Sequence, residues 1–254
     1  MKQTTIAVIN QKGGVGKTTT ATNLAAHLAS AQVSVLLVDL DPQGNATSGL
    51  GLEKEGVGPT SYEVLFGQAS LDQAVQPAGR EGLFVLPANA NLAAAEVELA
   101  TVEHREFALK NALAPAAFDY IIIDCPPALG LLTINALSAA SSILIPVQAE
   151  YYALEGLGQL LGTVQRVKEA LNPSLDLLGV VLTMYDKRTS LSEQVESELK
   201  NHFGDKVFKT VIPRNVRLAE APSFGKTIYE HDRWSKGARA YKQFSKEVAK
   251  RANG

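Results

Sequence analysis

The 254-residue sequence predicts an α/β fold with a doubly wound, mostly parallel sheet that is flanked by helices. Short apolar runs alternate along the chain with longer stretches in which apolar residues recur at helical spacing. Most of the short runs are apolar at every position, which is typical of strands buried on both faces of a parallel sheet. No linker rich in proline, glycine or serine divides the chain, so we expect residues 1–254 to form one domain with a basic C-terminal region.

The apolar runs and the helical patterns predict the order of the elements. Strands are expected at 4–10, 33–39, 83–88, 119–124, 141–147, 175–185 and 206–212. Helices are expected at 17–30, 131–140, 154–171, 191–203 and 235–251. Ser190, followed three residues later by Glu193, fits a capping box at the start of the fourth helix. The segment 45–80 is rich in glycine and its patterns are weak, so its structure is the least defined by the sequence.

Composition and charge restrict the class of protein. No run approaches the roughly 18 apolar residues of a membrane span, and the N-terminus resembles a strand rather than a signal peptide. Cys125 is the only cysteine, so an intramolecular disulfide is excluded and a cytoplasmic protein is expected. Residues 201–254 carry a net charge of +7 and the first 200 residues carry −9. This asymmetry suggests a face that binds a polyanion, although a solvated helix surface would give the same pattern.

The segment KGGVGKTT, residues 12–19, lies between the first predicted strand and the first predicted helix. Glycines let backbone N–H groups surround an anion closely, and the N-terminus of the following helix adds a favourable dipole. Lys17 would reach the β- and γ-phosphates of a nucleotide, and the Thr18 hydroxyl would bind Mg²⁺. The sequence therefore predicts a phosphate-binding loop formed by Lys12, Gly13, Gly14, Val15, Gly16, Lys17, Thr18 and Thr19.

Aspartates end two of the other predicted strands. Asp39 and Asp41 stand in VDLDPQGN, and Asp124 ends the strand in DYIIIDCPP. Beside a phosphate-binding loop, such carboxylates hold Mg²⁺ directly or through water, or orient the attacking water. The prolines and the glycine that follow Asp124 indicate a switch loop that responds to the γ-phosphate. A helix-capping or turn aspartate is the alternative interpretation of each.

The predicted phosphate-binding loop departs from the usual pattern. In G-x-x-x-x-G-K-[ST] the first glycine would fall at Gln11, and this sequence supplies Lys12 and Gly13 instead. The segment resembles the deviant Walker A motif, K-G-G-x-G-K-[ST], of the ParA/MinD family of nucleotide-dependent switches. The segments LLVDLDPQGN, DCPP, VQAEYYALEG, TMYD and VIPRNVRLAEAPSFGKTI resemble the ParA/Soj branch of partitioning ATPases. The resemblance covers nearly the whole chain.

The resemblance implies a Mg²⁺-dependent ATPase of chromosome or plasmid partitioning. Such proteins form an ATP-dependent homodimer and then bind double-stranded DNA without sequence preference. A ParB/Spo0J-type partner stimulates hydrolysis and releases the ATPase from DNA. For this chain, the resemblance implies a nucleoid-associated cytoplasmic protein that does not bind membranes.

The same resemblance implies roles for individual residues. Lys12 crosses to the nucleotide of the other subunit, Lys17 holds the phosphates and Asp41 positions the attacking water, so these three are the predicted catalytic residues. Asp39 is a structural or metal-side partner. The metal side comprises Thr18, Asp41 and Asp124, and Pro213 and Asn215 lie on the adenine side.

The predicted DNA contacts come from basic residues. The resemblance favours Arg188 and Arg217, and the basic C-terminal region adds Lys226, Lys242 and Lys246. For any single lysine, a plain surface charge is the alternative. Arg214 is either structural or directed toward the nucleotide.

A MinD-type membrane-associated positioning ATPase is the closest alternative, because it shares the ATP site. It would need a C-terminal amphipathic helix for lipid, whereas Tyr241, Phe244 and Val248 are few and are expected to face the core. A nitrogenase-type iron protein is excluded, since its cluster needs a pair of cysteines. GTP is disfavoured because the chain has no N-K-x-D string. An ATP-gated scaffold that hardly hydrolyses ATP stays open.

Overall fold

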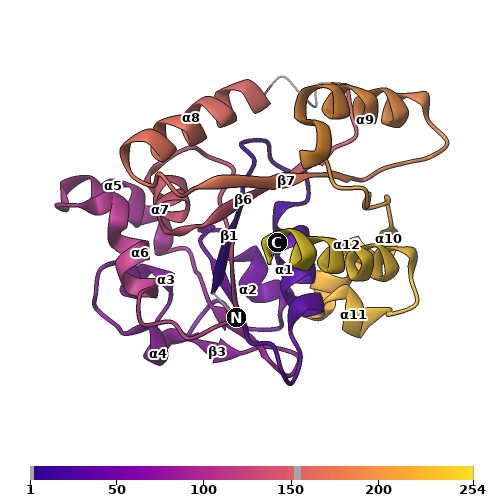
Figure 1. Cartoon of the computed structure of the whole chain (residues 1–254). Helices are drawn as coiled ribbons and strands as arrows, with labels where there is room; N and C mark the ends of the chain where they lie inside the picture. Colours follow the sequence, from indigo (N-terminus) through magenta and orange to yellow (C-terminus); the bar gives the residue numbers. More distant parts are fainter. Residues whose placement is uncertain (1–2, 152–155, 254) are drawn as a thin grey trace.

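The computed structural model describes residues 3–151 and 156–253 (Figure 1). Its centre is a seven-stranded sheet in the order β3-β4-β2-β5-β1-β6-β7. Neighbouring strands are parallel except for β3 and β4, which are antiparallel. The strands are β1 Thr4–Val8, β2 Val35–Asp39, β3 Gln76–Pro77, β4 Leu83–Leu86, β5 Tyr120–Asp124, β6 Ser142–Gln148 and β7 Asp176–Thr183. The predicted doubly wound, mostly parallel sheet is confirmed.

Helices connect the strands and cover both faces of the sheet (Figure 1). The α-helices are α1 Lys17–Leu28, α2 Asn45–Gly49, α3 Ser61–Leu65, α4 Leu71–Ala74, α5 Leu92–Glu98, α6 Ala108–Leu113, α7 Leu131–Ala139, α8 Leu157–Ala170, α9 Ser190–Phe203, α10 Val216–Glu220, α11 Ile228–His231 and α12 Lys236–Ala252. The 3₁₀ helices are η1 Leu99–Thr101, η2 Arg105–Phe107, η3 Gly204–Lys206 and η4 Ala221–Phe224. The five predicted helices correspond to α1, α7, α8, α9 and α12, and part of the third prediction, 154–155, lies outside the described residues.

Successive residues of the central strands point to opposite faces and form two cores. Ile6 of β1 belongs to the core that contains Leu24 of α1 and Phe244 of α12. The next residue, Ala7, belongs to the core that contains Leu160 of α8. Figure 1 shows α8 on one side of the sheet and α12 on the other. Because both faces are covered, the strands are apolar at every position, which is the pattern seen in the sequence.

The predicted strand at 206–212 is wrong. The segment runs beside β7, and the N–H of Phe208 donates to a β7 carbonyl oxygen at 2.8 Å. The next two N–H groups, of Lys209 and Thr210, donate instead to the Glu247 carboxylate of α12, at 2.9 and 3.1 Å. Because a side chain takes these donors, the ladder is interrupted: Val207 forms an isolated bridge with Val180, and the Ile212 N–H donates to the carbonyl oxygen of Leu182 at 2.8 Å.

Two local details also differ from the sequence-based expectation. The predicted capping box at Ser190 is wrong, because α9 already includes Ser190 and its N-cap residue is Thr189. The segment 45–80 contains three short helices and the two-residue strand β3. Two of these helices begin with true capping boxes, at Thr60 and Ser70, which mark their starts despite the surrounding glycines.

The basic C-terminal helix α12 packs directly on α1. Tyr241, Phe244 and Val248 are at most 1% exposed, as the sequence predicts. The Tyr241 hydroxyl lies 3.1 Å from the Thr20 hydroxyl of α1, and both groups are buried. The ring of Phe244 meets that of Phe208 edge to face, with centroids 4.9 Å apart. The helix that carries Lys242 and Lys246 on its exposed side is therefore fixed to the helix that follows the glycine loop.

We expect Phe244→Ala to lower the free energy of unfolding by about 3–5 kcal/mol, because it removes a fully buried ring between α12, α1 and the sheet. Urea denaturation would measure this loss. Lys250→Ala, at an exposed position of the same helix, is the matched control and should change the stability by less than about 0.5 kcal/mol. A similar small change for Phe244→Ala would show that α12 adds little to the core.

Candidate functional site

Three chain segments meet at the carboxyl edge of the sheet. The strands β2 and β1 lie on either side of β5. The register places Asp39, the last residue of β2, and Val8, the last residue of β1, opposite Asp124 of β5. The loops that follow these residues therefore start side by side, where open α/β sheets bind ligands.

The loop after β1 has the conformation that an anion nest requires. Gly14 and Gly16 have φ angles of +75° and +86°, which favour glycine over other residues. A Cβ atom added at Gly13 or Gly14 would meet no atom within 4 Å, so the space in front of the loop is open. No side chain caps the N-terminus of α1 and no acidic residue stands in its first turn. The backbone N–H groups at the N-terminus of α1 are therefore available to a phosphate group.

Lys17 begins α1 and is only 7% exposed. Its Nζ donates a hydrogen bond of 3.0 Å to the carbonyl oxygen of Lys12, across the open side of the loop. Burial lowers the pKa of Lys17, and the carboxylates of Asp124 and Asp41 partly offset this effect. The predicted phosphate lysine thus lies between the loop and the acidic residues.

Asp39 is fully buried and holds the next loop in place. One oxygen accepts hydrogen bonds from the N–H and the hydroxyl of Thr47, at 2.8 and 2.7 Å, and the other accepts from the N–H of Asp41 at 3.2 Å. Burial raises the pKa of Asp39 to about 6, although these bonds favour the ionised form. Of the two predicted alternatives for Asp39, a structural or a metal-side partner, this geometry supports the structural one.

Asp41 lies two residues beyond β2 and is 7% exposed. One of its oxygens accepts a hydrogen bond of 2.9 Å from the N–H of Gln43. The turn that follows contains Gly44, where an added Cβ would lie 2.8 Å from the carbonyl oxygen of Ala88. This tight turn directs the chain from Asp41 into α2.

Asp124 is the least satisfied acidic group in the described part of the chain. It is fully buried, and neither carboxylate oxygen has a hydrogen-bond partner of ordinary geometry there. Burial raises the pKa of Asp124 well above its usual range, and the charge of Asp39 raises it further. The Thr18 hydroxyl and Lys17 counteract part of this shift.

These groups fit a magnesium ion. Mg²⁺ is usually bound through one or two carboxylates, with substrate phosphates and water as its other ligands. The unpartnered oxygens of Asp124 and the nearby hydroxyl of Thr18 are oxygen donors of that kind. Among residues 3–151 and 156–253, no three acidic, histidine or cysteine side chains gather into a metal shell of their own. The phosphates of a nucleotide would therefore have to complete the coordination.

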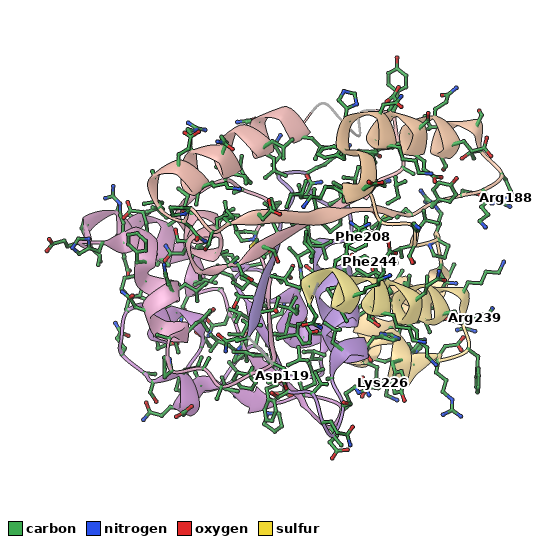
Figure 2. All side chains as sticks on the ribbon, viewed as in Figure 1. Asp119, Arg188, Phe208, Lys226, Arg239 and Phe244 are labelled. Atoms are coloured by element: carbon green, nitrogen blue, oxygen red, sulfur yellow. The ribbon has the colours of Figure 1, made fainter. Side chains whose placement is uncertain are left out.

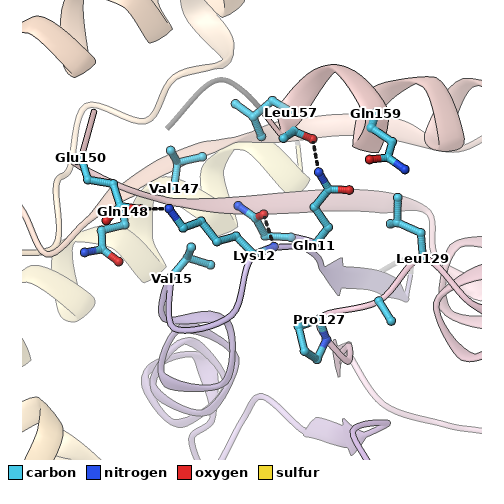
Figure 3. Close-up of a pocket in the computed structure, with 13 residues that line it drawn as sticks. Gln11, Lys12, Val15, Pro127, Leu129, Val147, Gln148, Glu150, Leu157 and Gln159 are labelled. Carbon is cyan, nitrogen blue, oxygen red and sulfur yellow. Dashed lines mark hydrogen bonds and ion pairs between the residues drawn. The ribbon is translucent and has the colours of Figure 1, made fainter. Parts of the chain in front are cut away.

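Lys12 lines a cavity of about 770 Å³ next to the glycine loop (Figure 3). Its side chain is 46% exposed and forms an ion pair with Glu150. Gln11 spans the same cavity and donates a hydrogen bond of 2.9 Å to the carbonyl oxygen of Gly156. Pro127 and Leu129, from the loop after Asp124, line another side of the cavity. Lys12 thus points away from the phosphate side, on which Lys17 lies.

The predicted adenine-side residues lie beyond the end of β7. The Oδ1 atom of Asn215 is buried and has no hydrogen-bond partner among the described residues, so it is a free acceptor. Pro213 is joined to Tyr185 by an isolated bridge. The Thr183 hydroxyl, at the end of β7, donates a hydrogen bond of 2.8 Å to the carbonyl oxygen of Val15 and so connects this region to the glycine loop.

The predicted DNA-binding residues do not all lie in one place. Lys226, Lys242 and Lys246 are exposed. Arg188 is held by Asp186 through two hydrogen bonds of 2.9 and 2.7 Å, and Arg217 pairs with Glu220 at 2.9 Å. Figure 2 shows Arg188 and Lys226 on the same side of the molecule as Arg239.

A basic hollow of about 950 Å³ lies on that side, between the loop after β7 and the start of α12. Its cationic residues are Lys187, Arg188, Lys209, Arg214, Lys236 and Arg239. The sequence analysis assigned Lys209, Lys236 and Arg239 no role. Their signal was present in the charge asymmetry, but only the fold brings 187–188 next to the C-terminal region.

Other residues of the site were assigned no role from the sequence. Thr47, Thr183 and Glu150 each make a contact that fixes a site loop or a site lysine, and Thr183 and Glu150 lie in the segments TMYD and VQAEYYALEG, which showed a resemblance but not these contacts. Cys125 is buried, and burial raises the pKa of its thiol, so it is poorly suited to act as a nucleophile.

The chain is similar to known proteins over almost its whole length. A family model described as an AAA domain matches residues 3–177. The sporulation initiation inhibitor protein Soj of Bacillus subtilis is 57% identical over 251 residues, which cover 98% of each chain. The chromosome partitioning protein ParA of Myxococcus xanthus is 53% identical over 248 residues, which cover 97% of this chain and 88% of the relative.

Solved structures with similar folds contain nucleotides. A structure described as cobyrinic acid a,c-diamide synthase from Mycobacterium smegmatis, with a bound ATP analog and magnesium, is 41% identical with a TM-score of 0.84 and covers 96% of this chain and 93% of its own. A putative plasmid partition protein from Borrelia burgdorferi bound to AMPPNP is 26% identical with a TM-score of 0.82, covering 98% of each chain.

The contrast between the two buried aspartates gives a stability prediction. We expect Asp124→Asn to raise the free energy of unfolding of the nucleotide-free protein at pH 8, because it removes a buried charge that Thr18 and Lys17 offset only in part. The pKa of Asp124 is raised on folding, so the wild type loses stability as pH rises toward the folded pKa. The advantage of the variant should therefore shrink as pH falls from 8 to 5.

Asp39→Asn is the matched control for this experiment. It weakens the acceptor of three hydrogen bonds and should lower the stability at pH 8. Urea denaturation at the two pH values measures both effects. A loss of stability of equal size in the two variants would contradict the difference that we infer between the two carboxylates.

Proposed function

This chain belongs to the ParA and Soj family of chromosome-partitioning ATPases, and we propose that it is an ATP-dependent switch that dimerises on ATP, binds DNA without sequence preference and hydrolyses ATP when a ParB/Spo0J-type partner stimulates it. Its fold is that of a P-loop nucleotide-binding protein, and its role is partitioning, as in the relatives named for it. ATP and Mg²⁺ are its nucleotide and metal, in keeping with the ligands named for similar structures.

The buried Asp124 carboxylate is the observation that carries the proposal. A charge without a partner is costly in the free protein, so its position favours a site that a cation completes on nucleotide binding. Lys17, Thr18 and the uncapped N-terminus of α1 surround the position that the β- and γ-phosphates would take. Bound Mg²⁺ would neutralise charge on those phosphates.

Asp41 is the residue that we assign to the attacking water. Its carboxylate lies at the same edge of the sheet and influences the pKa values of both Lys17 and Asp124. Asp39 fixes the loop from below through Thr47, so Asp41 is free to orient a water molecule for in-line attack. Hydrolysis then removes the γ-phosphate, which is the only difference between the two nucleotide states.

We assign Lys12 to the nucleotide of a second subunit. Its Nζ does not reach back into its own phosphate loop but pairs with Glu150 at the cavity beside it. A lysine that leaves this pair in the dimer could offset charge on the partner's phosphates, as an arginine finger does. ATP would then favour the dimer through contacts that ADP does not provide.

The basic hollow and the exposed lysines of the C-terminal region support binding to the DNA backbone. Arg188, Arg214 and Arg239 line or flank one surface on the side of the molecule opposite α5 in Figure 1. Phosphate contacts of this kind carry no sequence information. Dimerisation would join two such surfaces, so that the affinity for DNA rises steeply. Association with the nucleoid follows from this proposal.

The membrane-associated alternative has less support. The apolar residues of α12 are in the core and pack on α1, so they are not presented to lipid. In the described part of the chain, no helix is both long enough and apolar enough to span a membrane. Amide synthesis, which the Mycobacterium smegmatis structure is named for, also has less support. The only cysteine is buried and its thiol pKa is raised, so it is poorly suited to covalent catalysis of such a reaction.

The division of labour between the lysines can be tested. We expect Lys17→Ala to weaken ATP binding by about tenfold or more, because it removes a buried cation from the phosphate site. Lys12→Ala should bind ATP within about threefold of the wild type, as an exposed side chain outside that site. It should nevertheless fail to dimerise or to hydrolyse ATP. Calorimetry with an ATP analog measures ATP binding, and light scattering measures dimerisation. Equal loss of ATP binding in both variants would contradict the separate roles of the two lysines.

Nucleotide-dependent DNA binding is the central test of the proposal. With a labelled duplex, we expect strong binding with ATP and weak binding with ADP or without nucleotide. Asp41→Ala should retain the ATP-dependent binding but lose hydrolysis. Lys242→Ala should reduce the slope of log affinity against log salt concentration by about 1, whereas Lys110→Ala on α6 should not. Equal binding under all three nucleotide conditions would end the switch proposal.

A further inference from the structure

Glu96 makes an unexpected contact with the loop that follows Asp124. It lies on α5, and its two carboxylate oxygens accept hydrogen bonds from the N–H groups of Leu131 and Leu132, at 2.8 and 3.2 Å. These are the first two residues of α7, whose own N-cap residue, Gly130, has no side chain to cap the helix. A carboxylate at a helix N-terminus is favoured both by hydrogen bonding and by the helix dipole.

Gly130 leaves room for this contact. A Cβ atom added there would lie 2.6 Å from both oxygens of Glu96, which is closer than such atoms approach each other. A serine or an aspartate at this position could have capped α7 locally, as in most helices. The chain instead has glycine and takes its cap from a residue that precedes it by more than thirty positions. The end of the loop is thus held by a hydrogen-bond acceptor on α5 and not by a side chain of the N-cap residue itself.

The position of α5 is itself well fixed. Leu92, Ala95 and Leu99, on and directly after this helix, are all fully buried in the core that also contains Leu132 of α7. Glu96 is therefore held on a rigid element, half-buried, with its charge directed at α7. Glu98, on the exposed part of α5, accepts a hydrogen bond of 2.6 Å from the Tyr62 hydroxyl and is directed to α3 rather than to the loop.

The loop that Glu96 anchors is short and lies in the site. It covers 125–130 and begins directly after Asp124, at the buried end of β5. Pro127 and Leu129 line the cavity that contains Lys12. The Thr133 hydroxyl donates a further hydrogen bond to the carbonyl oxygen of Ala128. With one end fixed by β5 and the other by Glu96, the loop has little freedom to move unless the contact with α7 changes.

We propose that Glu96 is a positioning residue for ATP hydrolysis, which acts through the N–H groups of Leu131 and Leu132 to hold the 125–130 loop in place between Asp124 and the cavity that contains Lys12. This inference rests on the proposed ATPase function and deepens it. Glu96 touches neither the nucleotide site nor Lys17, and its effect is on where the loop lies when the γ-phosphate is attacked. Loss of the contact should slow turnover and leave ATP binding to Lys17 and the glycine loop unchanged.

The test uses the full chain with its DNA and partner protein as activators. Glu96→Ala should lower kcat by about fivefold to tenfold, the size expected for loss of a helix cap, with the affinity for an ATP analog changed less than about twofold. Glu96→Gln keeps one carbonyl acceptor and should restore part of the rate. Glu98→Ala, on the same helix, is the matched control and should leave kcat unchanged.

A second variant tests the contact itself. Gly130→Ala places a methyl group against Glu96, so it should slow turnover in the same way. The double variant Gly130→Ala with Glu96→Ala should be no slower than Gly130→Ala alone, because the clash is gone. Strict additivity of the two effects would overturn the inference, as would an ATP affinity that falls in proportion to kcat in Glu96→Ala.

Amide hydrogen exchange separates this inference from the proposed function. In Glu96→Ala, the N–H groups of Leu131 and Leu132 should exchange faster than in the wild type, with or without nucleotide, while those in the middle of α8 do not change. Unchanged exchange at these two amides would refute the anchoring role. A wild-type protein that hydrolyses no ATP under any condition would refute the proposed function, and the exchange result would still stand.

Discussion

The carboxylates of Asp39 and Asp124 end two neighbouring strands in register, and both are fully buried at the carboxyl edge of the sheet. Burial raises the pKa values of both groups, and a neighbouring carboxylate adds to the effect in each case, Asp41 for Asp39 and Asp39 for Asp124. The chain stabilises only one of them, Asp39, with three hydrogen bonds. Asp124 has no such hydrogen bonds and interacts with the charge of Lys17, near the position that a ligand would take. The other features of the site depend on this difference between the two carboxylates.

The sequence predicts this part of the molecule well because its determinants are local. A glycine-rich loop between a strand and a helix, and aspartates directly after apolar runs, occupy positions that follow from strand direction alone. The sheet itself was predicted from continuous apolar runs, since burial on both faces leaves no polar alternation. The one wrong strand, at 206–212, had the right composition. It failed because Glu247, some forty residues later, takes two of its N–H groups.

The contacts that the sequence could not predict are those between distant segments. Thr183 donates a hydrogen bond to the glycine loop from the end of β7, and Glu150 pairs with Lys12. Each of these residues is of an ordinary type, and only the fold shows what it meets. The basic hollow is a similar case. Its cations come from the loop after β7, from 209–214 and from α12, so the sequence shows their number but not that they share a surface.

The charges of the site also indicate what a second lysine would add beside a bound nucleotide. In the free protein the buried cation Lys17 interacts with the carboxylates of Asp41 and Asp124, and Asp39 is in register with Asp124, so the site is already acidic before any nucleotide arrives. A nucleoside triphosphate adds further negative charge in the same place, and ground-state repulsion would oppose its binding unless cations accompany it. Mg²⁺ at Asp124 would supply one such cation.

Lys12 has an exposed side chain and is already paired with Glu150, so a second lysine can reach the phosphates only by movement or from a second subunit. In this view the ATP-dependent dimer that we propose follows from electrostatics. In the proposed dimer, a partner's lysine would add positive charge beside the phosphates at this acidic edge of the sheet, where Asp41 and Asp124 are assigned to water and metal.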